Sequence, residues 1–250
     1  MTAIAICSGK GSPGTTFVAI NLSAAIGRSG REVLLVDLDP AGGDVCCYLA
    51  LDPRRGLYPM LRLEGGVPEH GRLLAETEEK TGALVLSGFP EQSNLASPQM
   101  LAAIVKTARA GDHTVLVDLG RVSDAVVPTA ADADRVILVV RPDLVSVLGA
   151  ERAFRRLEGG DVPRERIDVV VSCLDRRRPG DLAEVGEALG LEILASVPFD
   201  RRGARKALLQ QEPATTRRLR RAFDRLAERV LGQVDGNERA PVDEPVGVSA

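Results

Sequence analysis

The chain has 250 residues and a formal net charge of −3, and 44% of its residues are hydrophobic and 27% charged. This composition is typical of globular proteins and excludes a largely disordered chain. A chain of this length buries about three quarters of its unfolded surface, so it needs no disulfide or metal to fold. No apolar run reaches the ~20 residues of a membrane span, and the first residues lack the apolar segment of a secretory signal. We therefore expect a cytoplasmic protein with no integral membrane association.

Charge is distributed unevenly toward the end of the chain. Residues 235–250 hold four acidic residues and one arginine, and this polar, proline-containing stretch predicts a disordered acidic tail after a single domain at residues 1–234. The segment from Arg201 to Arg229 holds nine arginines and one lysine against three acidic residues. Such a segment is either a solvated helical face or a patch for DNA or anionic lipid, and both interpretations stay open.

Short apolar runs alternate with helical periodicity along the chain. The predicted strands are Ala3–Cys7, Val33–Leu38, Ala83–Ser87, Val115–Leu119, Val136–Val140, Ile167–Cys173 and Ile193–Val197. The predicted helices are Thr15–Arg28, Ser97–Arg109, Ser123–Ala131, Val145–Leu157, Leu182–Leu189 and one or two helices within Leu208–Leu231. The strand runs are continuously apolar, which indicates helices on both faces of the sheet. The repeated β-then-α order predicts a doubly wound α/β fold with a mostly parallel sheet.

Cysteine and histidine give little indication of chemistry. The four cysteines, Cys7, Cys46, Cys47 and Cys173, form no metal-binding spacing and are expected to be small apolar fillers. His70 and His113 are isolated in the sequence and predict no catalytic dyad.

The loop after the first predicted strand carries the strongest signal. It is rich in glycine and leads directly into a predicted helix, where main-chain amides and the positive end of the helix dipole can hold phosphate groups. A glycine-rich turn that binds no ligand is the alternative. The candidate phosphate-binding residues are Gly9, Lys10, Gly11, Ser12, Pro13, Gly14, Thr15, Thr16 and Phe17, with Thr16 placed to ligate Mg²⁺ through its hydroxyl.

Carboxylates follow two further predicted strands. Asp37 and Asp39 come at the end of the second strand, and Asp118 lies in the run Val115–Gly120. Because the carboxyl ends of parallel strands share one edge of the sheet, these groups are placed to reach Mg²⁺ or orient a water molecule. For Asp39, capping of a turn before Pro40 is the alternative.

These motifs resemble the deviant P-loop of the MinD/ParA ATPases, whose pattern is K-G-G-x-G-K-[TS]. Lys10 matches the signature lysine and Thr16 matches the magnesium-binding residue. Ser12 replaces the second glycine, and Thr15 occupies the position of the P-loop lysine. A threonine supplies a hydroxyl but no charge, so we expect ATP binding to weaken without vanishing, and hydrolysis to be weak or slow.

The resemblance implies roles for the remaining candidates. It implies that ATP and Mg²⁺ are the cofactors, that ATP is sandwiched in a homodimer, and that Lys10 reaches the partner's phosphate. Asp39 would position the attacking water, while Asp37 and Asp118 would support Mg²⁺. The run from Pro198 to Asp200 resembles the family's P-x-D nucleotide loop. Residues 171–174 stand where the family commonly has an asparagine that reads adenine, and they offer none.

Within the family, the missing P-loop lysine and the run Asp37–Asp44 resemble the TadZ/CpaE branch. That branch implies a localisation factor for pilus or envelope assembly, recruited to the cell pole or inner membrane by a partner. A membrane anchor at the C-terminus is not expected, because the predicted tail is acidic. Two alternatives stay open: a catalytically inactive scaffold, and a ParA-type partition ATPase that binds DNA nonspecifically. For DNA binding, the candidate residues are Arg201, Arg202, Arg205, Arg217, Arg218, Arg220 and Arg221.

Overall fold

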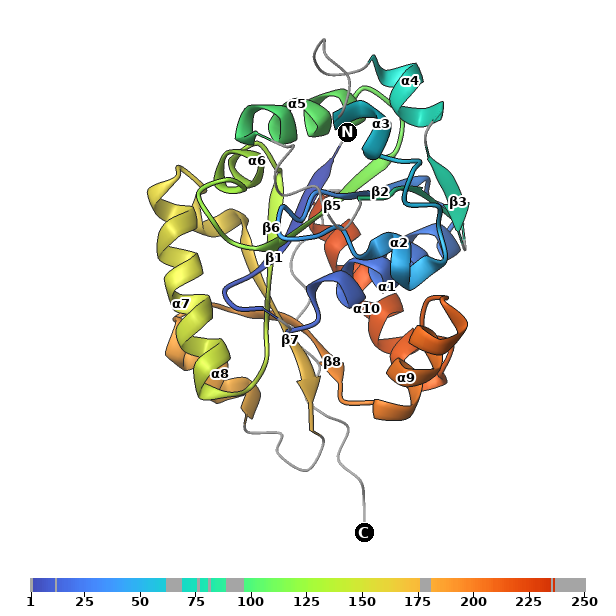
Figure 1. Ribbon diagram of the computed structural model, residues 1–250. Coiled ribbons are helices and arrows are strands. Elements are labelled where there is room, and N and C mark those ends of the chain that lie inside the picture. Colours follow the sequence, from blue (N-terminus) through green and yellow to red (C-terminus); the bar gives the residue numbers. More distant parts are fainter. Residues whose placement is uncertain are drawn as a thin grey trace.

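The computed structural model places the strands in one sheet with helices on both sides (Figure 1). It describes residues 2–11, 13–61, 69–75, 77–80, 82–88, 97–175, 181–234 and 236. Ser12 of the predicted phosphate-binding loop and, apart from Gly236, the predicted acidic tail lie outside these residues.

Within the described residues the sheet has eight strands in the order β3-β4-β2-β5-β1-β6-β7-β8, and all neighbours except β3 and β4 are parallel. The strands are β1 (Ala3–Ser8), β2 (Val33–Asp37), β3 (Glu78–Lys80), β4 (Ala83–Leu86), β5 (Thr114–Arg121), β6 (Arg135–Val140), β7 (Ile167–Leu174) and β8 (Ile193–Pro198). The helices are α1 (Thr15–Arg28), α2 (Val45–Leu49), α3 (Tyr58–Leu61), α4 (His70–Ala75), α5 (Pro98–Ala108), α6 (Val127–Ala131), α7 (Leu144–Gly159), α8 (Asp181–Leu189), α9 (Arg201–Gln210) and α10 (Arg217–Val234), with a 3-10 turn at Arg164–Arg166.

Side chains of each central strand alternate between two hydrophobic cores. In β1, Ala5 and Cys7 belong to the core under α5 and α7, whereas Ile4 and Ile6 belong to the core under α1 and α10. Both sets are fully buried because helices cover both sheet faces (Figure 1). The predicted doubly wound α/β fold with a mostly parallel sheet is confirmed.

All seven predicted strands are present, but the bounds of some predicted helices differ from those in the structure. The helix predicted at Ser123–Ala131 is the short α6, which begins beside Pro128, a residue suited to a first helical turn. The stretch Leu208–Leu231 contains a break around Pro213, and α9 begins earlier than predicted because Asp200 caps its first turn. The sequence patterns also gave no indication of β3, whose three residues are all charged and lie at the edge of the sheet.

The two histidines, which are far apart in the sequence, lie together in the structure. The rings of His70 and His113 stack with centroids 5.8 Å apart. His70 Nδ1 contacts the carbonyl oxygen of Thr107, and His113 Nε2 contacts that of Ala108, so both rings cover the end of α5. The filler interpretation holds for the buried Cys7 and Cys46, whereas Cys47 is exposed; all four thiols are free.

None of the helices in the described part of the chain is both long and apolar enough to cross a membrane.

Candidate functional site

The loop between β1 and α1 ends in Gly14, whose backbone conformation favours a residue without a side chain. Gly14 has φ of 96°, in the left-handed region, and precedes the first turn of α1. Neither a side-chain cap nor an acidic residue occupies this helix start among the described residues. The first amides of α1 therefore keep their donor capacity, and the positive end of the helix dipole faces the loop.

Contacts with strands β5 and β7 hold this loop in place. The Ser8 hydroxyl donates a hydrogen bond to the carbonyl oxygen of Lys10 at 2.9 Å, and it also contacts Gly120 O of β5. The buried Ser172 hydroxyl, on β7, donates to the carbonyl oxygen of Pro13. The loop is thus shaped by contacts to the protein itself, before any ligand binds.

Helix α7 packs directly on the backbone of the loop. A Cβ atom at Gly9 would lie 2.0 Å from the carbonyl oxygen of Gly149, far closer than any real contact. A Cβ at Gly149 would in turn lie 3.2 Å from the carbonyl oxygen of Gly9. Gly9 is therefore required for close packing against α7, which is a structural role beside the predicted phosphate contact.

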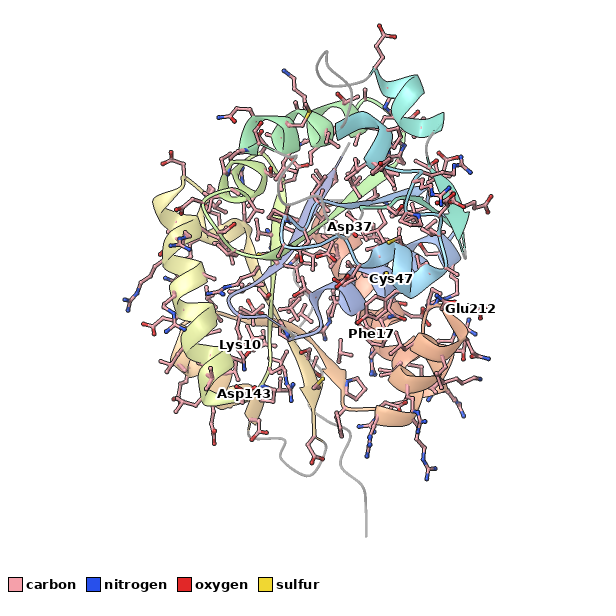
Figure 2. All side chains as sticks on the ribbon, in the orientation of Figure 1. Lys10, Phe17, Asp37, Cys47, Asp143 and Glu212 are labelled. Atoms are coloured by element: carbon pink, nitrogen blue, oxygen red, sulfur yellow. The ribbon has the colours of Figure 1, made fainter. Side chains whose placement is uncertain are left out.

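Lys10 points to the start of α7 in the single chain. Its Nζ lies 4.0 Å from Asp143 Oδ1, and the side chains of Lys10 and Asp143 are 45% and 42% exposed (Figure 2). Asp143 also accepts a hydrogen bond from the Ser146 amide and caps α7. A pair this exposed contributes little to stability, so Lys10 can leave it at little cost.

Asp37 and Asp118 are paired across adjacent strands. The two residues are register partners in the parallel pair β2 and β5, and both are fully buried. Asp37 accepts hydrogen bonds from the amides of Val45 (3.0 Å) and Asp39 (3.3 Å). Asp118 Oδ1 accepts one from the Gly120 amide at 3.0 Å, while its Oδ2 is buried without a hydrogen-bond partner among the described residues.

Burial dominates the electrostatics of these two carboxyl groups. It raises the pKa of Asp118 to about 6, although hydrogen bonding from the Thr16 side chain and the Gly120 amide acts in the opposite direction. Burial, and then the charge of Asp118, also raise the pKa of Asp37 well above its usual value. In the described residues neither carboxylate forms an ion pair with a lysine or arginine. A cation bound beside these two carboxyl groups would therefore stabilise their charged forms, which burial disfavours.

Asp39 lies against strand β5, which also carries Asp118. A Cβ atom at Gly120 would fall 2.0 Å from Asp39 Oδ2, so the carboxylate occupies the space that this glycine, with φ of 58°, leaves open. Asp39 Oδ1 also accepts a hydrogen bond from the Ala41 amide at 2.8 Å. The turn-capping contact that was the alternative interpretation is thus present, together with the predicted position beside Asp118.

Thr15 is buried at the start of α1. The residue is 6% exposed, and its hydroxyl has no hydrogen-bond partner among the described residues. A buried hydroxyl left without a partner is unfavourable and usually has a reason. The sequence singled out Thr15 for its missing charge, and the structure adds an unused donor at the same position.

Phe17, Pro198 and Asp200 have structural contacts of their own. The ring of Phe17 meets that of Phe223 edge-on, with centroids 5.9 Å apart, which turns it toward α10. Pro198 ends β8. Asp200 caps α9, since its Oδ1 accepts from the Gly203 amide at 2.8 Å and its Oδ2 from the Thr216 hydroxyl at 2.9 Å.

The chain matches the family described as the CobQ/CobB/MinD/ParA nucleotide binding domain over residues 4–214. The chain belongs to this family. That membership agrees with a glycine-containing β1–α1 loop beside buried carboxylates, and it supports a nucleotide-binding role for the domain.

Two curated relatives cover most of this chain. It is 26% identical to the septum site-determining protein MinD of Thermotoga maritima, over 92% of this chain and 88% of that protein. It is 34% identical to the chromosome-partitioning ATPase Soj of Thermus thermophilus, over 70% of each chain.

Solved structures agree on the fold. A ParA family ATPase from Chlorobium tepidum superposes with a TM-score of 0.79 at 19% identity, covering 91% of this chain and 98% of that one. MinD from Aquifex aeolicus gives a TM-score of 0.78 at 22% identity, with 97% and 100% covered. At these identities the likeness concerns the fold alone.

A nucleotide with Mg²⁺, which the family implies, fits the residues present. Asp118 offers a buried carboxylate oxygen without a hydrogen-bond partner in the described chain, and Thr16 brings a hydroxyl to the same group. Carboxylate and hydroxyl oxygens are the hard ligands that Mg²⁺ prefers. The unblocked start of α1 supplies the amides that phosphate groups need.

Three contacts of the loop were not predicted from the sequence: Lys10 with Asp143, Gly9 with Gly149, and Pro13 with Ser172. A signal for Asp143 was present, because an aspartate directly before a run with helical periodicity is typical of a helix N-cap. The other two contacts depend on which strands and helices are neighbours in space, which no local pattern reveals.

We predict that Asp200→Ala lowers the free energy of unfolding by about 1 kcal/mol, because it removes the cap of α9. Asp200→Asn keeps an oxygen acceptor and should lose less. The Gly203 amide holds the pKa of Asp200 below its usual value, with a smaller contribution from the Thr216 hydroxyl. The stability that the charge adds is therefore present above pH ~4, the unfolded pKa, and is lost as the pH falls through the lower folded pKa.

Urea unfolding of the parent and both variants, at neutral pH and in acid, measures these differences. Equal stability of Asp200→Ala and the parent at neutral pH would show that the cap contributes nothing.

Proposed function

We propose that this protein is an ATP-binding switch of the MinD/ParA type with weak or slow hydrolysis. The observation that carries the proposal is the convergence of three elements on one edge of the sheet: the unblocked start of α1, the buried pair Asp37 and Asp118, and Asp39 packed on Gly120. The amides at the start of α1 suit phosphate groups, and the carboxyl groups of Asp37 and Asp118 suit a divalent cation. This edge of the sheet is therefore suited to a magnesium-bound triphosphate.

Each residue has a distinct role in this proposal. The loop from Gly9 to Phe17 would hold the phosphates, chiefly through backbone amides. Thr16 and Asp118 would hold Mg²⁺, with Asp37 behind them. Mg²⁺, when bound, would neutralise charge that develops on the transferred phosphoryl group. Asp39 would orient the attacking water molecule, and Pro198 and Asp200 would border the nucleotide.

Thr15 is the reason to expect slow hydrolysis. A lysine at this position would donate a charged hydrogen bond to the phosphates, which contributes about 1.5–3 kcal/mol. The Thr15 hydroxyl is buried and has no partner within the described chain, so it can donate to a phosphate oxygen, but without charge. Binding should therefore survive better than catalysis, which needs charge in the transition state.

We predict that Thr15→Lys increases ATP affinity about tenfold or more, and increases hydrolysis at least as much, because it restores the missing charge. Thr15→Met is the matched control, since it adds a side chain of similar length without charge. Calorimetric titration with ATP and Mg²⁺, with phosphate release measured in parallel, tests both effects. If Thr15→Lys binds no tighter and hydrolyses no faster than Thr15→Met, the assigned position of Thr15 is incorrect.

The switch would work through dimerisation. Among the described residues, the ammonium group of Lys10 makes an exposed, 4.0 Å contact with Asp143, which leaves it available to a partner subunit at little cost. A homodimer with ATP sandwiched between subunits would use Lys10 on the partner's phosphate, and a catalytic contribution would follow from that contact.

We predict that Lys10→Ala abolishes ATP-dependent dimerisation, measured by sedimentation velocity with and without ATP and Mg²⁺. Lys106→Ala, an exposed lysine on α5, should dimerise like the parent. Identical sedimentation of the parent protein in both conditions would contradict the dimer proposal.

The cellular role that we propose is that of a cytoplasmic localisation factor similar to the TadZ/CpaE branch. The missing P-loop lysine and the run Asp37–Asp44 support this branch. A pilus, envelope-assembly or polarity protein would be the partner, and would recruit the dimer to the cell pole or inner membrane. Relatives named MinD, Soj and the antiactivator FleN of Pseudomonas aeruginosa (27% identity) indicate that related chains serve several positioning and regulatory systems.

A ParA-type partition role is the second candidate. It is favoured by the exposed arginines of α9 and α10, including Arg201, Arg202, Arg217, Arg220 and Arg221. Such a surface would bind DNA without sequence preference and with steep salt dependence.

This role predicts a gel shift of duplex DNA with ATP at ~50 mM salt that weakens strongly by ~200 mM. Absence of a shift at the lower salt would exclude it. A protein that neither binds ATP nor shifts DNA would be an inactive scaffold, the remaining alternative.

A further inference from the structure

Helix α9 buries its small residues and exposes its large apolar ones. Gly203 and Ala207, one helical turn apart, are buried, while Leu208 and Leu209 are 52% and 71% exposed. A surface helix normally buries its leucines. The neighbouring α10 follows that rule, since its Leu226 is fully buried. The pattern in α9 is therefore the reverse of what folding alone favours.

Close packing against α10 fixes which face of α9 points outward. A Cβ atom at Gly203 would lie 2.8 Å from Leu219 Cδ1 and 2.8 Å from Thr216 Oγ1. The carboxylate of Asp200 links the two helices, because it accepts hydrogen bonds from the Gly203 amide at the start of α9 and from the Thr216 hydroxyl just before α10. The inner face has no room for longer side chains, so the exposed leucines result from specific packing and not from a loosely attached helix.

Cations share the exposed face with the two leucines. Arg201, Arg202, Arg205 and Lys206 are all exposed, and α9 contains no acidic residue. In the described part of the chain, no carboxylate forms an ion pair with any of these four side chains. Figure 2 shows nitrogen-tipped side chains projecting from α9 away from the rest of the molecule. Because Arg201, Arg205 and Leu209 are spaced four residues apart, cations and leucine lie along one helical stripe.

We propose that α9 docks this protein on an anionic lipid surface. The four cations bind headgroup phosphates, and Leu208 and Leu209 enter the boundary between headgroups and acyl chains. This combination of basic and large apolar side chains on one helix is characteristic of helices that lie in the membrane interface. The docking helix is internal, between β8 and α10, and is distinct from the end of the chain.

Charge and apolarity together favour lipid over the other occupants. A second copy in a symmetric contact would place the cations of α9 against the same cations of its partner, which is repulsive. Duplex DNA would attract the cations, but its phosphate backbone offers no apolar surface to two leucines. An anionic bilayer satisfies both groups at once.

Docking through Leu208, Leu209 and the four cations of α9 uses none of the residues assigned above to the nucleotide. Its test is therefore made without ATP, using the full chain. Cosedimentation is measured with vesicles of phosphatidylcholine alone and with vesicles that contain about 40% phosphatidylglycerol, at low salt. Duplex DNA is offered to the same proteins in a parallel gel shift.

The main variant is Leu208→Gln with Leu209→Gln, which leaves every cation in place. Its matched control is Leu144→Gln, because Leu144 of α7 is 73% exposed, like Leu209. We expect the parent and the control to bind anionic vesicles, and the double variant to bind at least fivefold less, as loss of apolar insertion requires. Circular dichroism confirms that the double variant is folded, which its solvent-exposed positions favour.

Several results would overturn the proposal. No binding of the parent to anionic vesicles would refute it directly, and so would equal binding to vesicles with and without phosphatidylglycerol. Unchanged vesicle binding of the double variant would show that charge alone acts and that the leucines do not insert. A DNA shift without vesicle binding would assign the surface to nucleic acid.

Discussion

Parallel pairing of β2, β5 and β1 is the constraint on which the candidate site depends. It places Asp37 beside Asp118, and it brings the end of β1, with the loop that follows, next to β5. Because side chains and loops at the carboxyl ends of parallel strands meet at one edge, residues as far as 112 positions apart in the sequence form one cluster. The glycines at 9 and 120 then allow α7 and Asp39 to approach the backbone closely. None of these contacts would survive a change of strand order.

The site holds two buried carboxyl groups, and no lysine or arginine of the described chain forms an ion pair with them. Asp37 and Asp118 are fully buried, and burial raises the pKa of each. A fold selected only for stability would replace such groups with apolar residues or pair them with a cation. Their position beside an unblocked helix start gives a reason for keeping them, because a divalent cation bound with phosphates would meet both kinds of group.

The sequence predicted the layered fold well because continuous apolar runs and the β-then-α order are strong local signals. It predicted the convergence of Asp37, Asp118 and Thr16 for the same reason, since each follows or lies in a recognisable strand or loop. It did not predict β3, the stacking of His70 on His113, or the capping role of Asp200. These features depend on an edge position, on packing between distant helices and on the break between α9 and α10, none of which has a periodic pattern.

Co-crystallisation with ATP and Mg²⁺ tests the central claim most directly, which is that backbone amides after β1 hold a triphosphate without the usual lysine. The account predicts density for the phosphates at the start of α1 and for a cation near Asp118. Well-ordered crystals grown in saturating ATP that contain only water molecules in this loop would contradict it.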